Sequence, residues 1–290
     1  MRMISSGLRK KRALIVKDYV LHYLIILIIT IFVIFPYYWM VMTSIKPPEQ
    51  LMLSPTVWWP SHFDFSNYSL VWQQLPLLRY MGNSLFVAIS TTAICLVLST
   101  AAGYSLSRYK IRIREASVAL ILFTQLIPGM LPFVAFYFLM FKMGLTNTYF
   151  GLIIAYSTWG IPFCTLMMKD YFTSAVPLSL EESATIDGCT KWGVLIRIAL
   201  PISIPGMVAT SIFSFILAWN EFMWASIMLT DANMKPVAVG IYDYIGQYGG
   251  NVRVSMTMAA AVLITLPAMI VFAFFQKHLV SGLTSGAMKG

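Results

Sequence analysis

The residues best placed to do chemistry lie in one polar stretch, Pro177 to Pro201, within a chain that is otherwise mostly apolar. Ser179 and Glu182 have the spacing of a capping box, in which two side chains satisfy free amide groups at the start of a helix. Gly188 suits the left-handed residue that ends a short helix. Thr190 is expected to cap the N-terminus of a second helix. The chemistry indicated is therefore recognition by two short helices joined at a glycine.

The small and apolar side chains of this segment also suit two short helices that another surface can approach. Ser183 and Ala184 on the first predicted helix would let another surface approach closely. The second helix carries apolar residues at helical spacing, and we expect Pro201 to stop it. We interpret the segment as a docking element. The apolar residues of the second helix are Trp192, Leu195 and Ile198.

No enzymatic site is predicted. The sequence lacks the Gly-Lys-Ser/Thr arrangement that cradles nucleotide phosphates, so we do not expect this chain to hydrolyse ATP. The cysteines are widely spaced and indicate neither a disulfide framework nor a metal site. The histidines fall in different segments and cannot share a site. These residues are Cys95, Cys164, Cys189, His22, His62 and His278.

The composition predicts the element that must carry this docking segment. Apolar residues make up 59% of the 290 residues and charged residues only 11%, too few to cover a soluble globule. We therefore predict an all-α polytopic membrane protein. Apolar runs long enough to cross a bilayer, uncharged except for Glu221 in the fifth, indicate six transmembrane helices, at residues 19–45, 81–107, 116–141, 151–168, 205–228 and 254–276.

The distribution of charge predicts the orientation. The net charge of +9 could suggest nucleic acid, but basic residues in a membrane protein collect on cytoplasmic segments. Fifteen of the 20 Lys and Arg residues fall on the side of the N-terminus and five on the other. We expect a basic cytoplasmic tail at 1–18, a cytoplasmic tail at 277–290, and residues 177–201 in the cytoplasm. Lipid, and not nucleic acid, is the expected partner.

The docking segment also resembles a known pattern. Glu182-Ser183-Ala184, Gly188 and Ile198-Ala199-Leu200-Pro201 match E-A-A, three residues, G, nine residues, I-x-L-P, with Ser183 in place of alanine. This pattern marks the membrane subunits of binding-protein-dependent ABC importers. The resemblance implies a type I ABC importer permease fold over residues 19–276, with its core at 81–276.

In that family the docking loop, also called the EAA loop, inserts into the subunit that hydrolyses ATP. The resemblance therefore implies that ATP and Mg are bound by a partner and that this chain needs no cofactor. Glu182 is expected to pair with a basic residue of the ATPase, unless it serves only as a cap. The residues expected to couple to the ATPase are Glu182, Ser183, Ala184, Asp187, Gly188, Ile198, Leu200 and Pro201.

The C-terminal stretch Phe275 to Gly290 is similar to the ending of one of the two paired permeases of oligosaccharide importers. This likeness implies a sugar cargo, a homologous second permease, two copies of an ABC ATPase and an extracytoplasmic solute-binding protein. It also implies a place in the bacterial inner membrane with both termini cytoplasmic. The alternatives are an ABC importer for a non-sugar solute and a stand-alone secondary transporter.

Two further groups are candidate sites. Asn220 and Glu221 lie in the fifth predicted span, where a carboxylate is costly unless it faces a cavity or a partner. They are expected at the translocation path or subunit interface, or else near hydrating solvent. The outer segment 230–253 is either an interfacial loop or a contact for the binding protein. Its expected contact residues are Tyr242, Tyr244, Gly246 and Tyr248.

Overall fold

The computed structural model describes residues 2–51, 53, 55–109, 114–129, 131–248 and 254–287. All regular elements in these ranges are helical. The helices form two compact units, which are described separately. One unit comprises Met1–Gln74 and Tyr248–Leu263, and the other comprises Leu75–Gln247 and Ile264–Gly290.

The first unit is built on the long helix α1 (Arg2–Ser44). Its segment Asp18–Ser44 is apolar and long enough to cross a membrane, and none of its most apolar window is buried. The end of α1 is tied to α2 (Ser66–Gln74), because Asn67 Nδ2 donates to the Ser44 carbonyl at 3.0 Å. Ser44 Oγ also lies 2.8 Å from the Tyr68 hydroxyl. The 3₁₀ turn η1 (Pro48–Gln50) follows α1.

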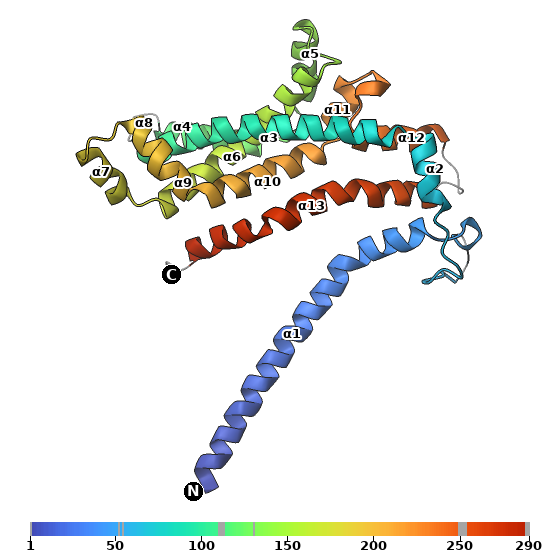
Figure 1. The fold of residues 1–290 in the computed structure, drawn as a ribbon, viewed down its shortest axis with the longest axis horizontal. Coiled ribbons are helices and arrows are strands. Elements are labelled where there is room, and N and C mark those ends of the chain that lie inside the picture. Colours follow the sequence, from blue (N-terminus) through green and yellow to red (C-terminus); the bar gives the residue numbers. More distant parts are fainter. Residues whose placement is uncertain are drawn as a thin grey trace. The chain divides into compact units, whose positions relative to one another are not determined.

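The second unit is organised around α3 (Leu77–Arg108), α6 (Tyr149–Ala175) and α10 (Ile204–Trp219), which pack along one another (Figure 1). Close approach of α3 and α6 depends on a glycine. A Cβ at Gly103 would lie 2.7 Å from Met168 Cβ and 2.8 Å from the Lys169 amide nitrogen. The second and fourth expected spans are confirmed as α3 and α6, and α6 extends beyond the expected bounds at both ends.

Two of the other expected spans are interrupted. The run 116–141 forms α4 (Arg114–Leu126) and α5 (Phe133–Lys142) rather than one helix. Pro128 and Pro132 lie between them, and each lacks the amide that a continuous helix needs. The run 205–228 is divided at Asn220 into α10 and α11 (Met223–Met228).

Four helices of the described chain are therefore long and apolar enough to cross a membrane: those within α1, α3, α6 and α13 (Val254–Ala287). A fifth span is formed if the bent pair Lys191–Ile202 and Ile204–Trp219 counts as one. The sixth expected span corresponds to Val254–Gln276 of α13. Six crossings are compatible with this structure when α4 and α5 together make one broken crossing.

The short helices gather at the two ends of the second unit (Figure 1). At one end lie α7 (Leu178–Ile186), α8 (Lys191–Val194), the π-helical turn η2 (Leu195–Ala199) and α9 (Leu200–Ile202). At the other lie α11, the 3₁₀ turn η3 (Ala232–Met234) and α12 (Val237–Tyr248). The outer segment is therefore largely helical rather than a simple loop.

Side-chain amides fix that second end. Asn147, with φ of 56°, accepts bonds on Oδ1 from the amides of Thr230 at 3.0 Å and Asp231 at 2.9 Å. Asn83 Nδ2 donates to the carbonyls of Asn233 at 2.8 Å and Lys235 at 3.0 Å. The turn before α12 is thus held by residues of α3 and of the loop before α6.

Candidate functional site

The first helix of the segment 177–201, α7, begins earlier than the capping box predicts. Its N-cap is Pro177, and no side chain caps it. Ser179 lies inside the helix, where its carbonyl accepts a 2.9 Å bond from Ser183 Oγ. The predicted Ser179–Glu182 capping box was therefore wrong. The helix already begins after Pro177, so Ser179 is not the N-cap residue and its hydroxyl does not bond to the first free amides.

The end of α7 is as predicted. Gly188 has φ of +88°. Its amide donates to the Thr185 carbonyl at 3.1 Å, and the Cys189 amide donates to the Ala184 carbonyl at 2.9 Å. These two bonds form a Schellman motif, which requires a left-handed residue at the glycine position. A Cβ on Gly188 would meet nothing within 4 Å, so conformation and not space selects glycine here.

If residues 177–201 couple this chain to an ATPase, as the resemblance implies, Gly188→Val should abolish uptake while the protein still inserts into the membrane. A β-branched residue is strained at positive φ, at a cost of about 1–2 kcal/mol, and relief of that strain would move α8 relative to α7. Gly188→Asn is the matched control, because asparagine tolerates the left-handed region. Transport assays on both variants test the prediction, and normal transport by the valine variant would refute it.

The second helix starts where the sequence predicts and continues further. Thr190 Oγ1 accepts a bond from the Gly193 amide at 3.2 Å, which confirms the cap. The helical path then runs through η2 and α9 to Ile202, so Pro201 does not stop it. Pro201 is the second residue of α9 and comes directly after the π-helical turn η2, an irregularity in the helical hydrogen-bond pattern of the kind found where helices bend. A bend of 74° follows, between Ile202 and Ile204.

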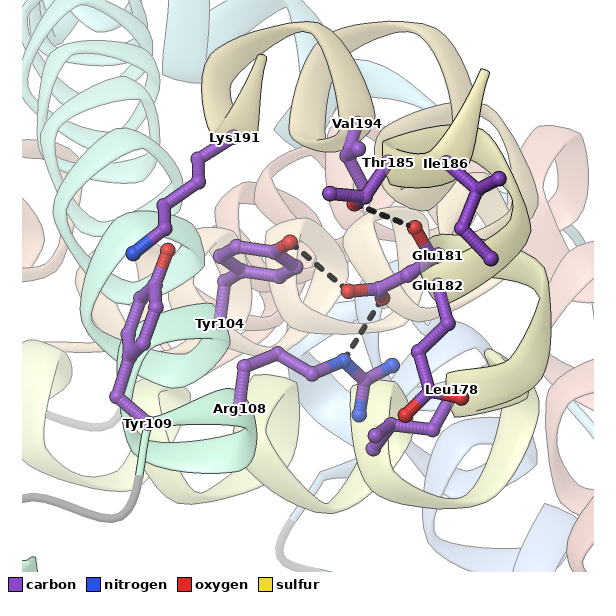
Figure 2. Close-up of a pocket in the computed structure, with 10 residues that line it drawn as sticks. All are labelled: Tyr104, Arg108, Tyr109, Leu178, Glu181, Glu182, Thr185, Ile186, Lys191 and Val194. Carbon is purple, nitrogen blue, oxygen red and sulfur yellow. Dashed lines mark hydrogen bonds and ion pairs between the residues drawn. The ribbon is translucent and has the colours of Figure 1, made fainter. Parts of the chain in front are cut away.

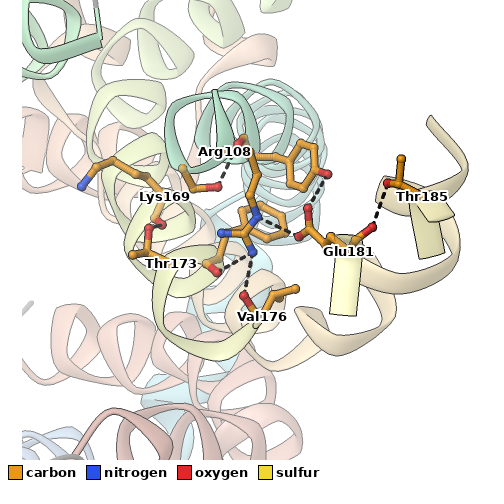
Figure 3. Close-up of polar contacts among 9 residues, drawn as sticks. Arg108, Lys169, Thr173, Val176, Glu181 and Thr185 are labelled. Atoms are coloured by element: carbon orange, nitrogen blue, oxygen red, sulfur yellow. Dashed lines mark hydrogen bonds and ion pairs between the residues drawn. The ribbon is translucent and has the colours of Figure 1, made fainter. Parts of the chain in front are cut away.

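A buried ion pair joins α7 to the end of α3 (Figure 3). Arg108 Nε lies 2.7 Å from Glu181 Oε1, and these side chains are only 7% and 11% exposed. The Tyr104 hydroxyl donates to the other carboxylate oxygen, Glu181 Oε2, at 3.0 Å. Both oxygens of the carboxylate are thus bonded to α3. Charge-assisted bonds of this kind are shorter and stronger than neutral ones.

The same arginine also binds the end of α6. Arg108 Nη2 donates to the carbonyls of Phe172 at 2.9 Å and Val176 at 2.8 Å. Arg108 therefore connects three elements: its own helix α3, the C-terminal end of α6, and α7 through Glu181 (Figure 3). No sequence pattern pointed to a role for Arg108 or Glu181, which are separated by 73 residues.

The burial pattern of α7 is inverted. Glu181 and Ala184 are buried, whereas Leu178, Leu180 and Ile186 are 53%, 44% and 85% exposed. A surface helix normally turns its apolar side chains toward the core. Here the inward face is held by an ion pair and a small residue, and the apolar side chains face outward. An exposed apolar surface of this kind marks a site of contact with a protein partner or with the membrane.

A cavity of about 550 Å³ lies between α7, α8 and the end of α3 (Figure 2). Arg108 and Glu181 lie at one side of it. On the other side, Lys191 Nζ lies 5.2 Å from the centre of the Tyr109 ring, a cation–π arrangement. Glu182 and Ile186 also line the cavity. The site thus offers separate basic, acidic and apolar groups around one hollow.

The structure divides the expected coupling residues into two sets. Glu182, Ser183, Asp187, Gly188 and Pro201 are exposed. Ala184 is buried, and Ile198 and Leu200 are half-buried. Leu200 packs against a core cluster that includes Tyr104 and Phe172. The second set therefore holds the segment on α3 and α6, whereas the first set is available to a partner.

Asn220 and Glu221 lie at the break between α10 and α11. The Glu221 carboxylate accepts bonds from the amides of Trp224 at 2.9 Å and Ala225 at 3.2 Å. Asn220 Nδ2 donates to the Ile216 carbonyl at 2.9 Å. The carboxylate thus satisfies the first amides of α11, a role that the hydropathy pattern did not suggest.

The expected binding-protein contacts fall on α12. Tyr242 is 60% exposed, and its ring lies 4.8 Å from that of Phe222. Tyr244 is half-buried. Gly246 and Tyr248 lie in the helical backbone of α12, and their side-chain environments are outside the described part of the chain. Residues 249–253 are also outside it.

Comparison with known proteins identifies the family. Residues 96–285 match the family described as binding-protein-dependent transport system inner membrane component. The chain belongs to this family. This permease is 33% identical to the sulfoquinovosyl glycerol transport system permease protein SmoH of Agrobacterium fabrum, with 89% of each chain covered. It is 34% identical to the trehalose/maltose transport system permease protein MalG of Thermococcus litoralis, with 91% of this chain and 94% of that protein covered.

A third relative and a solved structure support the same family and fold. The permease is 32% identical to the diacetylchitobiose uptake system permease protein DasC of Streptomyces coelicolor, over 89% of this chain and 92% of that protein. A chain of a bacterial ABC transporter that imports alginate has the same fold, with a TM-score of 0.75, 22% identity, and coverage of 90% of this chain and 95% of that chain. The permease therefore has the type I ABC importer fold that the docking pattern implied.

Proposed function

We propose that this permease forms half of the translocation path of an ABC importer for a sugar, and that the sugar is an oligosaccharide. Its relatives are named for the transport of sulfoquinovosyl glycerol, diacetylchitobiose and trehalose/maltose, all of which contain sugar units. The other half of the path comes from a homologous second permease. Sequence likeness over about nine-tenths of the chain supports the proposal.

Energy comes from a separate ATPase that docks on residues 177–201. The observation that carries this part of the proposal is the inverted burial of α7, which leaves Leu178, Leu180 and Ile186 exposed beside the cavity. Two ATPase copies would bind ATP and Mg, one for each permease. The excess of basic residues on the N-terminal side supports an inner-membrane protein with both termini and this segment in the cytoplasm.

On the opposite side we propose that a solute-binding protein delivers the sugar to the end that carries α12. The exposed Tyr242 ring offers an apolar face and a hydroxyl for such a contact, and Tyr244, Gly246 and Tyr248 continue the same helix. Glu221 and Asn220 lie at the α10–α11 break, at the path or the subunit interface. A binding protein is named in a complex of the alginate transporter, which has the same fold.

Reconstitution tests the function. The permease, its co-expressed partner subunits and the loaded binding protein should take up a labelled disaccharide or oligosaccharide only when ATP is supplied inside. A transporter for a non-sugar solute would couple ATP hydrolysis to uptake and reject every sugar tested. A stand-alone transporter would move solute without the ATPase, and either result would overturn the proposal.

For Glu182 we predict a dependence on charge. Its side chain is exposed and does not cap α7, so substitutions should leave the fold intact. Glu182→Lys should reduce co-purification of the ATPase strongly, because lysine repels a basic partner, whereas Glu182→Gln should reduce it modestly. Equal retention of the ATPase by the two variants in detergent would show that no ion pair forms at this position.

A further inference from the structure

The segment that follows α1 has an unusual composition for a connection between membrane helices. From Leu51 to Phe63 it contains no Asp, Glu, Lys or Arg. Several of its large side chains are exposed, with Trp58 at 57%, Trp59 at 60% and Phe63 at 48%. We refer to residues 55–63 as the aromatic loop. An exposed, uncharged group of this size calls for a partner surface.

The aromatic loop folds back along α1. The Trp58 ring lies 5.4 Å from that of Trp39 and 6.0 Å from that of Phe35. The Tyr38 hydroxyl donates to the Trp58 carbonyl at 3.4 Å. These three partners lie up to nine residues before the end of α1 at Ser44. The loop is therefore level with the last turns of the helix and not beyond its end.

A lysine fixes this arrangement without adding charge to the surface. Lys46 is buried, and its amino group donates to the Val57 carbonyl. The same group lies 4.2 Å from the centre of the Trp39 ring. The cation nearest to the loop is thus covered by the loop itself and by α1. The large exposed side chains of the loop are Trp58, Trp59 and Phe63, and Thr56, Ser61 and His62 are exposed beside them.

The depth of the loop follows from helix geometry. The apolar part of α1 starts at Asp18, and at 1.5 Å per residue Phe35 and Trp39 lie about 26 Å and 32 Å along the axis from it. The hydrocarbon core of a bilayer is about 30 Å thick. Trp58, which touches both residues, is therefore at the boundary between hydrocarbon and headgroups. Trp is enriched at that depth because its ring is apolar and its N–H is polar.

We propose that the aromatic loop is a lipid-interface anchor, with Trp58, Trp59 and Phe63 among the headgroups and upper acyl chains at the C-terminal end of α1. Lipid is the favoured occupant because the loop is continuous with the exposed apolar surface of α1 and contains no Asp, Glu, Lys or Arg for a protein partner to pair with. The proposal requires only that α1 spans the bilayer. It does not depend on the transported solute.

Spin labels at Trp59→Cys and Phe63→Cys test the anchor in the assembled transporter in phospholipid nanodiscs. Glu49→Cys is the matched control, because Glu49 is exposed and lies two residues before Leu51, where the segment begins. Cys189 is replaced by serine in all three variants, and the buried Cys95 and Cys164 are retained. Collision with oxygen, which concentrates in lipid, is compared with collision with a water-soluble nickel chelate.

We expect the ratio of oxygen to nickel collision rates at positions 59 and 63 to exceed that at position 49 several-fold. A ratio equal to the control would place the loop in water. Protection from both reagents would mean that a protein subunit covers it, and a change on adding the binding protein would identify that protein as the occupant. Each of these three results overturns the proposal. Two positions are labelled, so if one variant fails to assemble, the collision ratio at the other position still tests the proposal.

Discussion

Glu181→Ala should destabilise the purified permease by about 3–5 kcal/mol, the cost of removing one partner from a buried ion pair. The loss should be large because Arg108 is 7% exposed and would keep its charge without the carboxylate. Tyr104 would lose its acceptor at the same time. Thermal unfolding in detergent should show a clear decrease in midpoint, and uptake should be lost because α7 is no longer held on α3.

The adjacent Glu182 provides the control. Glu182→Ala removes the same side chain from the same helix at an exposed position, so the unfolding midpoint should remain near that of the parent protein. Glu181→Gln should fall between the two alanine variants, since an amide oxygen can still accept from Tyr104 or Arg108. Equal midpoints for the two alanine variants would mean that the Arg108–Glu181 pair does not support this end of the permease.

Gly103→Ala should also destabilise the permease, by about 1–3 kcal/mol, as overpacking does in a close-packed interior. The added methyl would lie 2.7 Å from Met168 Cβ and 2.8 Å from the Lys169 backbone nitrogen. A backbone atom cannot move aside as the end of a flexible side chain can. The expected result is separation of α3 from α6, visible as a lower unfolding midpoint and reduced uptake.

Gly82→Ala separates packing from helix propensity. Gly82 lies in the same helix, and a Cβ there would meet nothing within 4 Å. Alanine is favoured over glycine in a helix by about 1 kcal/mol, so this variant should be as stable as the parent or more stable. If both alanine variants raised the midpoint, close contact at Gly103 would not be what joins α3 and α6.

Within the docking segment, residues 177–201, the features that the sequence predicted correctly are those governed by local signals. Gly188 and Thr190 each act on amides or carbonyls within five residues, and both were assigned correctly. The beginning of α7 was misassigned because two local signals competed. Pro177 and Ser179 can both start a helix, and nothing in the sequence alone ranks them.

The Arg108–Glu181 pair could not be read from spacing, because its partners are separated by 73 residues. Burial was also hard to predict, since Glu181 and Glu182 are neighbours of identical type. Helical phase offered one signal. Glu181 lies three residues before Ala184 and so shares its face. The apolar residues of α7 would have suggested the opposite face, because apolar side chains normally turn toward the core.

The broken spans have a different cause. A hydropathy count detects apolar side chains but not backbone amides, so the run 116–141 scored as one span. Pro128 and Pro132 leave the intervening backbone without two donors, and the helix divides there. At Glu221 the reverse holds. A carboxylate that looked costly in a span caps the new helix that starts after the break.

Because of the 74° bend after Ile202, residues 191–202 project as an arm at an angle to α10. The arm from Lys191 to Ile202 is about 18 Å long at 1.5 Å per residue, and the buried Ser203 lies at the bend. A change of about 10° in the bend would move the Lys191 end by about 3 Å relative to α10, on the order of one hydrogen-bond length. Because Leu200 and Ile202 pack on the core cluster that contains Tyr104 and Phe172, such a change would have to shift those contacts.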